Sequence, residues 1–319
     1  MIAPSAPMSP DALQGIVPAL ITPLDPDGHV DEESVASLVE FQIDAGVNGL
    51  LILGSTGEGP LLSVENKLRL VRTTVAAARG RVPVMVGIAH SSPAESAAFG
   101  NLAHQAGANA LVTTPPFYFL SSQPELIGYY RYLHPRLDLP LITYDVPSAV
   151  KTKIAASTVR ALAEDGLIIG IKDSSGDLAG FRDMLIATQH LPHFHALTGS
   201  EHYVDAAMLV GGHGGVLGLA SVIPEVYVDI CSAVRSGDWP RANQLQQRAI
   251  AALQMIYVNS SGGSLTAGAI GSFKLALCDM GVIRHPTVSN PLLTLNDEDR
   301  ARVRAIMSGV GIQAHATHT

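Results

Sequence analysis

Aromatic side chains, cysteines and basic residues are all scarce in this sequence. Only 5% of its 319 residues are aromatic, and 20 Lys and Arg are outnumbered by 28 Asp and Glu, for a net charge of -8. Proteins that bind nucleic acids need a basic patch, so we expect no nucleic-acid partner. The two cysteines, Cys231 and Cys278, lack the spacing of a metal or redox site and are expected to be buried thiols in a reducing compartment.

Long apolar runs are missing too. No stretch reaches the roughly 18 consecutive apolar residues of a transmembrane helix, and residues 1–14 have no basic residue and no apolar core typical of a signal peptide. We therefore expect a cytoplasmic protein without a membrane partner. Hydrophobic residues nevertheless make up 47% of the chain, which is enough for a large buried α/β core.

Eight short apolar runs recur along the chain, each followed by a stretch of helical character. They are continuous rather than alternating, as expected of parallel strands that are covered on both faces. Eight βα units in succession predict a (β/α)8 TIM barrel. The runs are residues 16–22, 49–54, 82–88, 108–113, 139–146, 167–171, 195–198 and 215–219.

The pattern becomes helical throughout after the eighth run. We predict a barrel over residues 15–223 and a C-terminal helical appendage over residues 224–310, flanked by a flexible N-terminal extension, residues 1–14, and a flexible tail, residues 311–319. Active sites in this fold lie at the carboxyl ends of the strands. Candidate site residues should therefore follow the apolar runs directly.

Lys172 stands at the end of the sixth run. Burial at the end of such a strand disfavours the ammonium form and favours the neutral amine, which is the nucleophile in Schiff-base formation with a carbonyl substrate. The alternative is a lysine that closes the strand and extends its ammonium into water.

Two further strand ends carry candidate groups. Residues 54–58, with the sequence GSTGE, follow the second run, and a glycine-rich turn with two hydroxyls suits a small anion such as a carboxylate. The alternative is a simple turn. Tyr144 ends the fifth run and could relay protons, or it could be a buried tyrosine whose hydroxyl is bonded to the backbone.

Taken together, residues 54–58, 144–147 (YDVP), 170–174 (GIKDS) and 214–216 (GGV) strongly resemble the dihydrodipicolinate synthase / N-acetylneuraminate lyase family. The order and spacing match from about residue 15 to about residue 281. The resemblance implies a pyruvate-dependent class I aldolase on a TIM barrel, a homotetramer built as a dimer of dimers. It also implies that no cofactor is needed beyond the covalent lysine imine with the 2-oxo acid.

The resemblance also assigns roles to individual residues. Lys172 matches the Schiff-base lysine and Tyr144 the general acid/base, while Tyr118 matches a tyrosine that is inserted into the neighbouring subunit's site. Substrate-binding positions are matched by Gly54, Ser55, Thr56, Ser174, Gly199, Glu201 and Leu217. Within this set, Ser55 and Thr56 would bind the 2-oxo acid's carboxylate, and the backbone of Leu217 would line the pyruvate site.

One position departs from the synthase branch of the family. That branch has an arginine two residues after the proline of the tyrosine motif, where it holds the carboxylate of the aldehyde substrate. Here Ala149 occupies that place, and alanine cannot make a bidentate carboxylate contact. We therefore disfavour 4-hydroxy-tetrahydrodipicolinate synthase activity. Lys151 or Lys153 could replace the missing cation, and Asp145 stands where asparagine is frequent.

We predict a carbon–carbon lyase that acts on pyruvate, an aldehyde and a 2-oxo sugar acid or similar hydroxylated 2-oxo acid. One alternative is a hydro-lyase that dehydrates a deoxy sugar acid, or a hydratase-aldolase, through the same imine. A non-catalytic 2-oxo acid binding paralogue is another. No metal site is expected, because His193 and His195 precede the seventh run at the opposite end of the barrel and are predicted to be solvated.

Overall fold

A computed structural model describes residues 6–260 and 262–314 of the chain. Eight short strands alternate with helices over the first two thirds of the sequence. The strands are β1 Gly15–Pro18, β2 Leu50–Ile52, β3 Val84–Gly87, β4 Ala110–Thr113, β5 Leu141–Asp145, β6 Gly170–Asp173, β7 His195–Thr198 and β8 Gly214–Leu217. Each lies within, or within one or two residues of, one of the eight apolar runs.

All strand pairs in the sheet are parallel, and the order is β1-β8-β7-β6-β5-β4-β3-β2. The remaining seam lies between β1 and β2, where Ala19 and Leu51 form an isolated parallel bridge. There the Leu20 N–H donates to the Leu51 carbonyl at 2.9 Å. The sheet therefore forms a nearly closed barrel, and the predicted (β/α)8 fold is confirmed.

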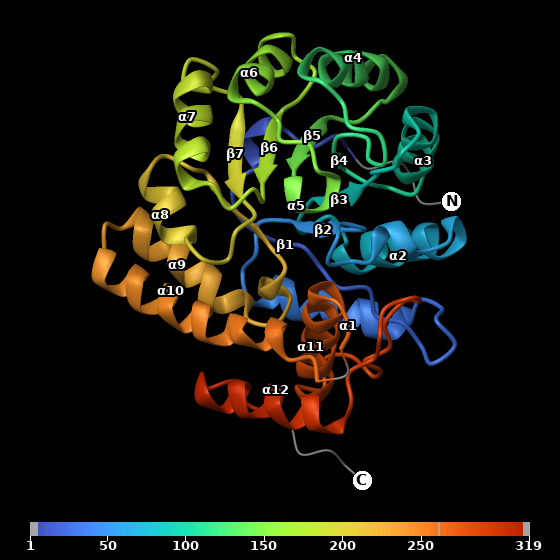
Figure 1. The fold of residues 1–319 in the computed structure, drawn as a ribbon, viewed down its shortest axis with the longest axis vertical. Helices are drawn as coiled ribbons and strands as arrows, with labels where there is room; N and C mark the ends of the chain where they lie inside the picture. Colours follow the sequence, from blue (N-terminus) through green and yellow to red (C-terminus); the bar gives the residue numbers. More distant parts are fainter. Residues whose placement is uncertain (1–5, 261, 315–319) are drawn as a thin grey trace.

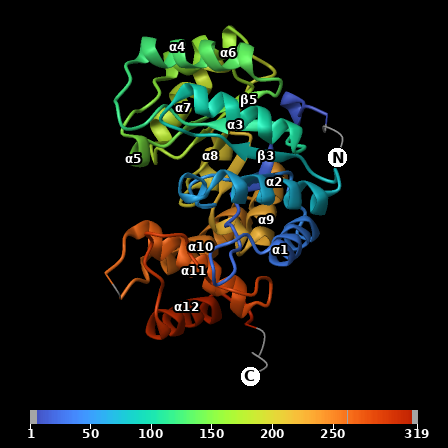
Figure 2. The ribbon, with the colours of Figure 1, turned by 90° about the vertical axis from the view of Figure 1, so that its right-hand side faces the viewer.

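Helices surround the barrel and continue beyond it (Figure 1). The helices between strands are α1 Glu32–Asp44, α2 Val64–Ala78, α3 Pro93–Gln105, α4 Gln123–Leu133, α5 Pro147–Val150, α6 Ala156–Glu164, α7 Leu178–Thr188 and α8 Val204–Leu209. Those after β8 are α9 Pro224–Arg235, α10 Trp239–Leu253, α11 Leu265–Asp279 and α12 Asp297–Gly309. Figure 2 shows α10, α11 and α12 gathered at the end of the molecule away from α4 and α6.

Short 3-10 turns complete the structure at Pro10–Ala12, Gly59–Leu61, His134–Arg136, Leu219–Ser221 and Gln254–Tyr257. The first of these lies inside the expected N-terminal extension. Met8 and Leu13, on either side of it, are buried and join the apolar cluster inside the barrel. Packing of the N-terminal segment therefore begins at Met8, whereas residues 1–5 and 315–319 of the expected flexible ends lie outside the described residues.

Side chains alternate along each strand, and this alternation divides the core in two. Inward-facing residues fill the barrel with Val17, Leu51, Met85, Val112, Ile142, Tyr144, Leu197 and Val216. A larger cluster lies between the strands and the surrounding helices. Both cysteines are free thiols, and burial raises the pKa of Cys278 to about 12. None of the helices described here combines the length and apolar character needed to cross a bilayer.

His195 corrects the expectation of two solvated histidines. His193 is exposed, but His195 is the first residue of β7 and only 8% exposed. Its ring lies 4.4 Å from the ring of His213, measured between centroids, in an edge-on arrangement. Burial, followed by the neighbouring imidazole of His213, lowers the pKa of His195, and burial also lowers the pKa of His213.

This histidine pair predicts a loss of stability in mild acid. Because the folded-state pKa of His195 lies below the usual value of a histidine, the unfolded chain binds more protons as the pH falls through that range, and unfolding becomes easier. We expect the melting temperature to fall between pH 7.5 and pH 5.5, and the fall to be smaller in His195→Gln. Equal pH slopes for the two proteins would contradict this assignment.

A buried ion pair ties α11 to the loop after β2. The side chains of Lys274 and Glu58 are both fully buried and form an ion pair. The Lys274 ammonium also donates to the Thr287 carbonyl at 2.6 Å, and the Ser289 N–H donates to Glu58 Oε2 at 2.5 Å. Burial lowers the pKa of Lys274, although the Glu58 carboxylate opposes the effect.

Removing only one member of this pair should be costly. Lys274→Met leaves the Glu58 carboxylate buried without its counter-ion, which typically costs about 3–5 kcal/mol of unfolding free energy. In Glu58→Gln/Lys274→Met both charges are gone, so we expect a smaller loss. Urea unfolding of the three proteins measures this, and a double variant less stable than Lys274→Met would contradict the pairing.

Candidate active site

The core of the site is the pair Lys172 and Tyr144 on adjacent strands. β5 and β6 pair in a register that places Tyr144 directly opposite Lys172. Both side chains are buried, with 5% of Lys172 exposed, and the Lys172 ammonium nitrogen lies 4.2 Å from the centre of the Tyr144 ring. The predicted nucleophile and the predicted acid/base therefore lie side by side near the carboxyl ends of their strands.

Gly199, at the end of β7, packs against this pair. A Cβ atom at position 199 would lie 3.0 Å from Lys172 Cε and 2.0 Å from Ser174 Oγ. A side chain at position 199 would therefore displace the Ser174 hydroxyl and press on the Lys172 side chain. Leu217 is fully buried at the end of β8, and its carbonyl accepts from the Ala19 N–H at 2.8 Å.

The loop after β2 is held in a tight conformation. Leu53 and Glu58 both have positive φ values, 59° and 57°. Cβ atoms at Gly59 and Gly87 would lie 2.1 and 2.3 Å from the Leu53 carbonyl oxygen, so the chain passes too close for any side chain at those positions. Thr22 Oγ1 donates to the Gly57 carbonyl at 2.6 Å. These constraints fix Ser55 and Thr56 at the rim of the barrel.

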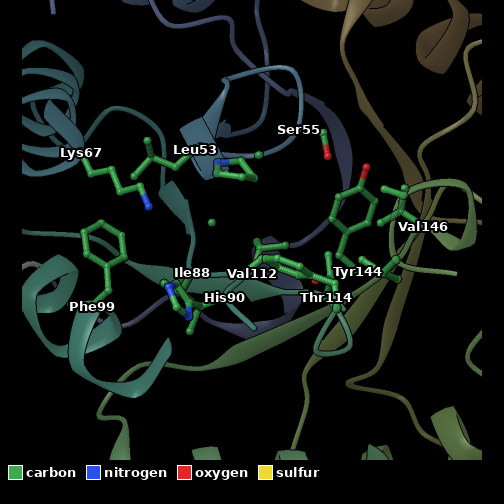
Figure 3. Close-up of a pocket in the computed structure, with 18 of the residues that line it drawn as sticks. Leu53, Ser55, Lys67, Ile88, His90, Phe99, Val112, Thr114, Tyr144 and Val146 are labelled. Atoms are coloured by element: carbon green, nitrogen blue, oxygen red, sulfur yellow. The ribbon is translucent and has the colours of Figure 1, made fainter. Parts of the chain in front are cut away.

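A cavity of about 240 Å³ opens beside Tyr144 (Figure 3). Its walls are mainly apolar, and they include Leu53, Gly54, Ser55, Ile88, Phe99, Val112, Phe117, Tyr144, Val146, Ala149 and Val150. In Figure 3 the hydroxyls of Ser55 and Tyr144 point toward one another at one end. At the far end the Lys67 ammonium lies 5.5 Å from the centre of the Phe99 ring, and burial lowers the pKa of Lys67.

A second cleft, about 250 Å³ in volume, lies between the barrel rim and the C-terminal helices. Its polar lining comes from Ser55, Thr56, Glu201 and Thr266, and Phe273 of α11 closes one side. Glu201 Oε1 accepts from the Gly218 N–H at 2.9 Å, which fixes the carboxylate at the cleft. No sequence motif predicted that Glu201 would bond the Gly218 N–H. None predicted that α11 would line this cleft.

The predicted residues therefore do not all face one pocket. Ser55 lines both cavities, Gly54 and Tyr144 line the first, and Thr56 and Glu201 line the second. Lys172 instead lines a small void inside the barrel, because the Tyr144 ring lies over its ammonium.

Tyr118 lies away from both cavities. It is 87% exposed in the loop after β4, has a φ of 85°, and contacts the ring of Phe119, which is 80% exposed. Positive φ is unfavourable for a bulky residue, so this loop holds two aromatic rings in water at some cost in backbone energy.

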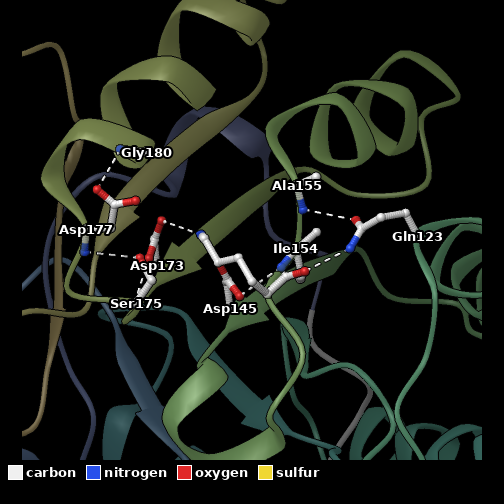
Figure 4. Close-up of polar contacts among 9 residues, drawn as sticks. Gln123, Asp145, Ile154, Ala155, Asp173, Ser175, Asp177 and Gly180 are labelled. Carbon is white, nitrogen blue, oxygen red and sulfur yellow. Dashed lines mark hydrogen bonds and ion pairs between the residues drawn. The ribbon is translucent and has the colours of Figure 1, made fainter.

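A charge cluster that the sequence did not signal lies at the ends of β5 and β6 (Figure 4). Lys153 forms ion pairs with Asp145 and with Asp173, the latter at 3.4 Å. The Lys151 ammonium donates to the Ser148 carbonyl at 2.6 Å. Both lysines are therefore engaged elsewhere, and the side chain facing the first cavity at the position of the family's arginine is the methyl group of Ala149.

Metal ligands do not gather anywhere in the part of the chain that the structure describes. Across residues 6–260 and 262–314, no group of three or more His, Cys, Asp or Glu side chains is arranged to hold an ion. The arrangement offers an amine, a phenol and hydroxyls instead. Such groups suit imine formation and proton transfer.

Comparison with known proteins agrees with this chemistry. The profile of the dihydrodipicolinate synthetase family matches residues 12–310. The chain is 31% identical over 301 residues to a 4-hydroxy-tetrahydrodipicolinate synthase of Aromatoleum aromaticum, covering 94% of this chain and 99% of that protein. It is 33% identical over 301 residues to a protein of the same name from Phenylobacterium zucineum, covering 94% and 98%.

Solved structures give the same result. A dihydrodipicolinate synthase from Bacteroides thetaiotaomicron superposes with a TM-score of 0.87 at 36% identity, over 93% of this chain and 98% of that one. A prophage protein of the same family from E. coli K12, solved in complex with pyruvate, superposes with a TM-score of 0.88 at 28% identity, over 94% and 99%. The chain therefore belongs to the dihydrodipicolinate synthetase family, whose members are pyruvate-dependent class I aldolases, carbon–carbon lyases that use a lysine–pyruvate Schiff base and no external cofactor.

Proposed function

We propose that this protein reversibly joins pyruvate to an aldehyde, or cleaves the resulting 2-oxo acid, through an imine on Lys172. The observation that carries the proposal is the buried Lys172 amine against the Tyr144 ring at paired positions of β5 and β6. In the proposed role, the amine attacks the keto carbon of pyruvate and water is lost from the carbinolamine. The resulting imine withdraws electrons from the neighbouring carbon, which loses a proton and adds to the aldehyde carbonyl.

Tyr144 and Ser55 are placed to serve the proton transfers in this sequence. Their hydroxyls point toward one another at the end of the first cavity (Figure 3). In the proposal the phenol moves a proton to and from the carbinolamine oxygen and later to the new hydroxyl. Ser55 and Thr56 hold the carboxylate of the 2-oxo acid, so that its keto carbon meets the amine in a fixed orientation.

The second cleft supports a hydroxylated 2-oxo acid as substrate. Thr56, Glu201 and Thr266 line it with hydroxyl and carboxylate oxygens, and these are partners for hydroxyl groups. A sugar acid whose carboxylate end lies at Ser55 would extend its hydroxylated chain past Glu201. Ser174 and Gly199 border the same end of the barrel, and we assign them to the substrate wall.

The wall of the first cavity around Ala149 argues against a substrate carboxylate bound at that wall. Ala149, Val146 and Val150 present only apolar groups where the synthase branch has its arginine. A carboxylate buried against such a wall would lose its hydration without compensation. Although the named relatives are 4-hydroxy-tetrahydrodipicolinate synthases, we therefore propose a different aldehyde partner from aspartate semialdehyde.

We also propose that a second copy of the chain contributes a side chain to the apolar cavity. The aromatic ring of Tyr118 is almost fully exposed on each chain, and an apolar cavity adjoins Tyr144. In the proposed dimer, Tyr118 of each subunit enters the other's cavity and reaches the Ser55 and Tyr144 hydroxyls. A pair of such dimers would form the proposed homotetramer.

Imine trapping tests the proposed function directly. After incubation with pyruvate and reduction with borohydride, we expect a covalent adduct on Lys172, mapped by peptide mass spectrometry, and none on Lys172→Ala. Tyr144→Phe should slow turnover about 10²–10⁴-fold, because a general acid/base is lost. A folded wild-type protein that gives no adduct would refute the proposal and favour a paralogue that only binds 2-oxo acids.

Product analysis with a panel of aldehydes and 2-oxo acids then identifies the reaction. Free pyruvate and an aldehyde from a hydroxylated 2-oxo acid support the aldolase, whereas loss of water alone supports a hydro-lyase. Rapid condensation of pyruvate with aspartate semialdehyde would contradict the argument from Ala149.

Subunit mixing tests the role of Tyr118. Tyr118→Phe should lower turnover roughly tenfold or more through loss of the relayed proton, with the oligomer unchanged in sedimentation. Mixing Tyr118→Phe with Lys172→Ala subunits should restore activity, because the intact Lys172 then receives an intact Tyr118 from the other chain. Additive, unrestored activity after subunit exchange would show that Tyr118 does not act across the interface.

A further inference from the structure

Two carboxylates lie at adjacent positions at the ends of β5 and β6, next to Tyr144 and Lys172 in the sequence. Asp145 and Asp173 are the last residues of β5 and β6, and they pair in register with each other just as Tyr144 pairs with Lys172. Because successive side chains point to opposite faces of a strand, the carboxylates lie on the outer side of the barrel wall. Both are buried, Asp145 completely.

Lys153 provides the positive charge between them. It follows the short helix α5, and its ammonium forms ion pairs with Asp145 Oδ2 and, at 3.4 Å, with Asp173 Oδ2 (Figure 4). The other carboxylate oxygens accept backbone N–H groups: Asp145 Oδ1 from Ile154 at 3.2 Å and Asp173 Oδ1 from Ser175 at 2.7 Å.

The lysine itself is held in place by its neighbours. Its backbone carbonyl accepts from Gln123 Nε2 at 2.9 Å, and Gln123 Oε1 accepts from the Ala155 N–H at 3.0 Å and from Thr158 Oγ1 at 2.7 Å. These contacts fix the segment after α5 against α4 and α6. The ammonium is therefore presented to both strand ends from a rigid support, although 41% of the side chain is exposed.

Two tyrosines and one further carboxylate, that of Asp177 at the start of α7, lie around this cluster. Tyr130 from α4 lies near Asp145, and Tyr203 from the loop before α8 lies near Asp173. Burial raises the pKa of Asp145, and the Lys153 ammonium opposes this effect. Burial lowers the pKa of Lys153, but its hydrogen bond to Asp145 and the charge of Asp173 outweigh burial, so that its pKa lies above the usual value. Without the lysine, two buried carboxylates would repel each other at the ends of paired strands.

We propose that Lys153 is a positioning residue, which ties Asp145 to Asp173 across the ends of β5 and β6 and thereby fixes the Lys172 amine relative to the Tyr144 hydroxyl. The inference rests on the proposed function of these two residues. It also explains the aspartate at position 145. Asp145 and Lys153 form an ion pair at the strand ends, so the Lys153 ammonium is not available to a substrate carboxylate.

Lys153→Met provides the main test. We expect the single-turnover rate of imine formation with saturating pyruvate to fall roughly tenfold or more, because small displacements of reacting groups are costly. The loss should be larger at pH 8 than at pH 6, because burial raises the pKa of Asp145, the Lys153 ammonium that opposes this effect is gone, and a proton on this carboxyl relieves the repulsion. The KM for pyruvate should change by less than about threefold, because its carboxylate is bound by another loop.

Three companion proteins separate positioning from general stability. Asp145→Asn/Lys153→Met removes the repulsion together with the cation, so it should recover most of the rate. Arg131 of α4 forms an exposed ion pair with Asp165 at 2.7 Å. Arg131→Met removes this pair and should leave the rate of imine formation and its pH profile unchanged. Lys153→Gln repeats the pH comparison if the methionine variant does not fold.

The total amount of trapped imine measures how many active sites are intact. If Lys153 only stabilised the fold, Lys153→Met would lower this amount and leave the rate constant of imine formation unchanged. That result, or a Lys153→Met rate equal to the wild-type rate at both pH values, would overturn the inference and leave the proposed function intact. Failure of the proposed function itself would appear in the wild-type protein, as the absence of any imine on Lys172.

Discussion

The pairing register of β5 with β6 is the constraint on which the site depends. It sets Tyr144 opposite Lys172 on the inner face and Asp145 opposite Asp173 on the outer face. A slip of one residue would exchange the two faces and direct the carboxylates into the apolar barrel. The same register therefore creates the proposed reactive pair and the two like charges behind it. Lys153 is the group that makes this outer arrangement electrostatically acceptable.

The C-terminal helices take part in the site as well as covering the barrel. α11 contributes Thr266 and Phe273 to the cleft beside Ser55 and Thr56, and its Lys274 forms the buried ion pair with Glu58. Because Glu58 has a positive φ and belongs to the same loop as Ser55, its ion pair restrains the backbone that presents the hydroxyls. A buried ion pair is weak evidence for stability, but here it fixes the conformation of a loop on which both cavities depend.

The sequence predicted the barrel because parallel strands covered on both faces leave continuous apolar runs, and such runs do not depend on distant residues. It placed Lys172 and Tyr144 near strand ends for the same reason, whereas their expected roles came from the family resemblance. The ion pair between Asp145 and Lys153 could not be predicted, because the short helix α5 and the turn after it separate them and decide where the ammonium lies. The burial of His195 depends on His213, which directly precedes the neighbouring strand β8. Lys274 lies in an otherwise apolar helix that gives no sign of its partner.

The placement of charge around the two cavities is the basis for proposing an aldehyde partner without a second carboxylate. At the wall where such a contact would form, the side chain is Ala149. The cation that the sequence adds nearby, Lys153, is neutralised by Asp145 and Asp173, and Glu201 adds a carboxylate to the polar cleft. On the proposal, an acceptor that carries its own negative charge would meet an apolar wall at Ala149 and a like charge at Glu201, and the one ammonium on the first cavity, that of Lys67, lies at its far end beside Phe99. A neutral hydroxylated aldehyde would instead find hydrogen-bond partners in the polar cleft. On the proposed mechanism, the site recognises its 2-oxo acid by a carboxylate that binds at Ser55, and it favours an aldehyde that has no carboxylate.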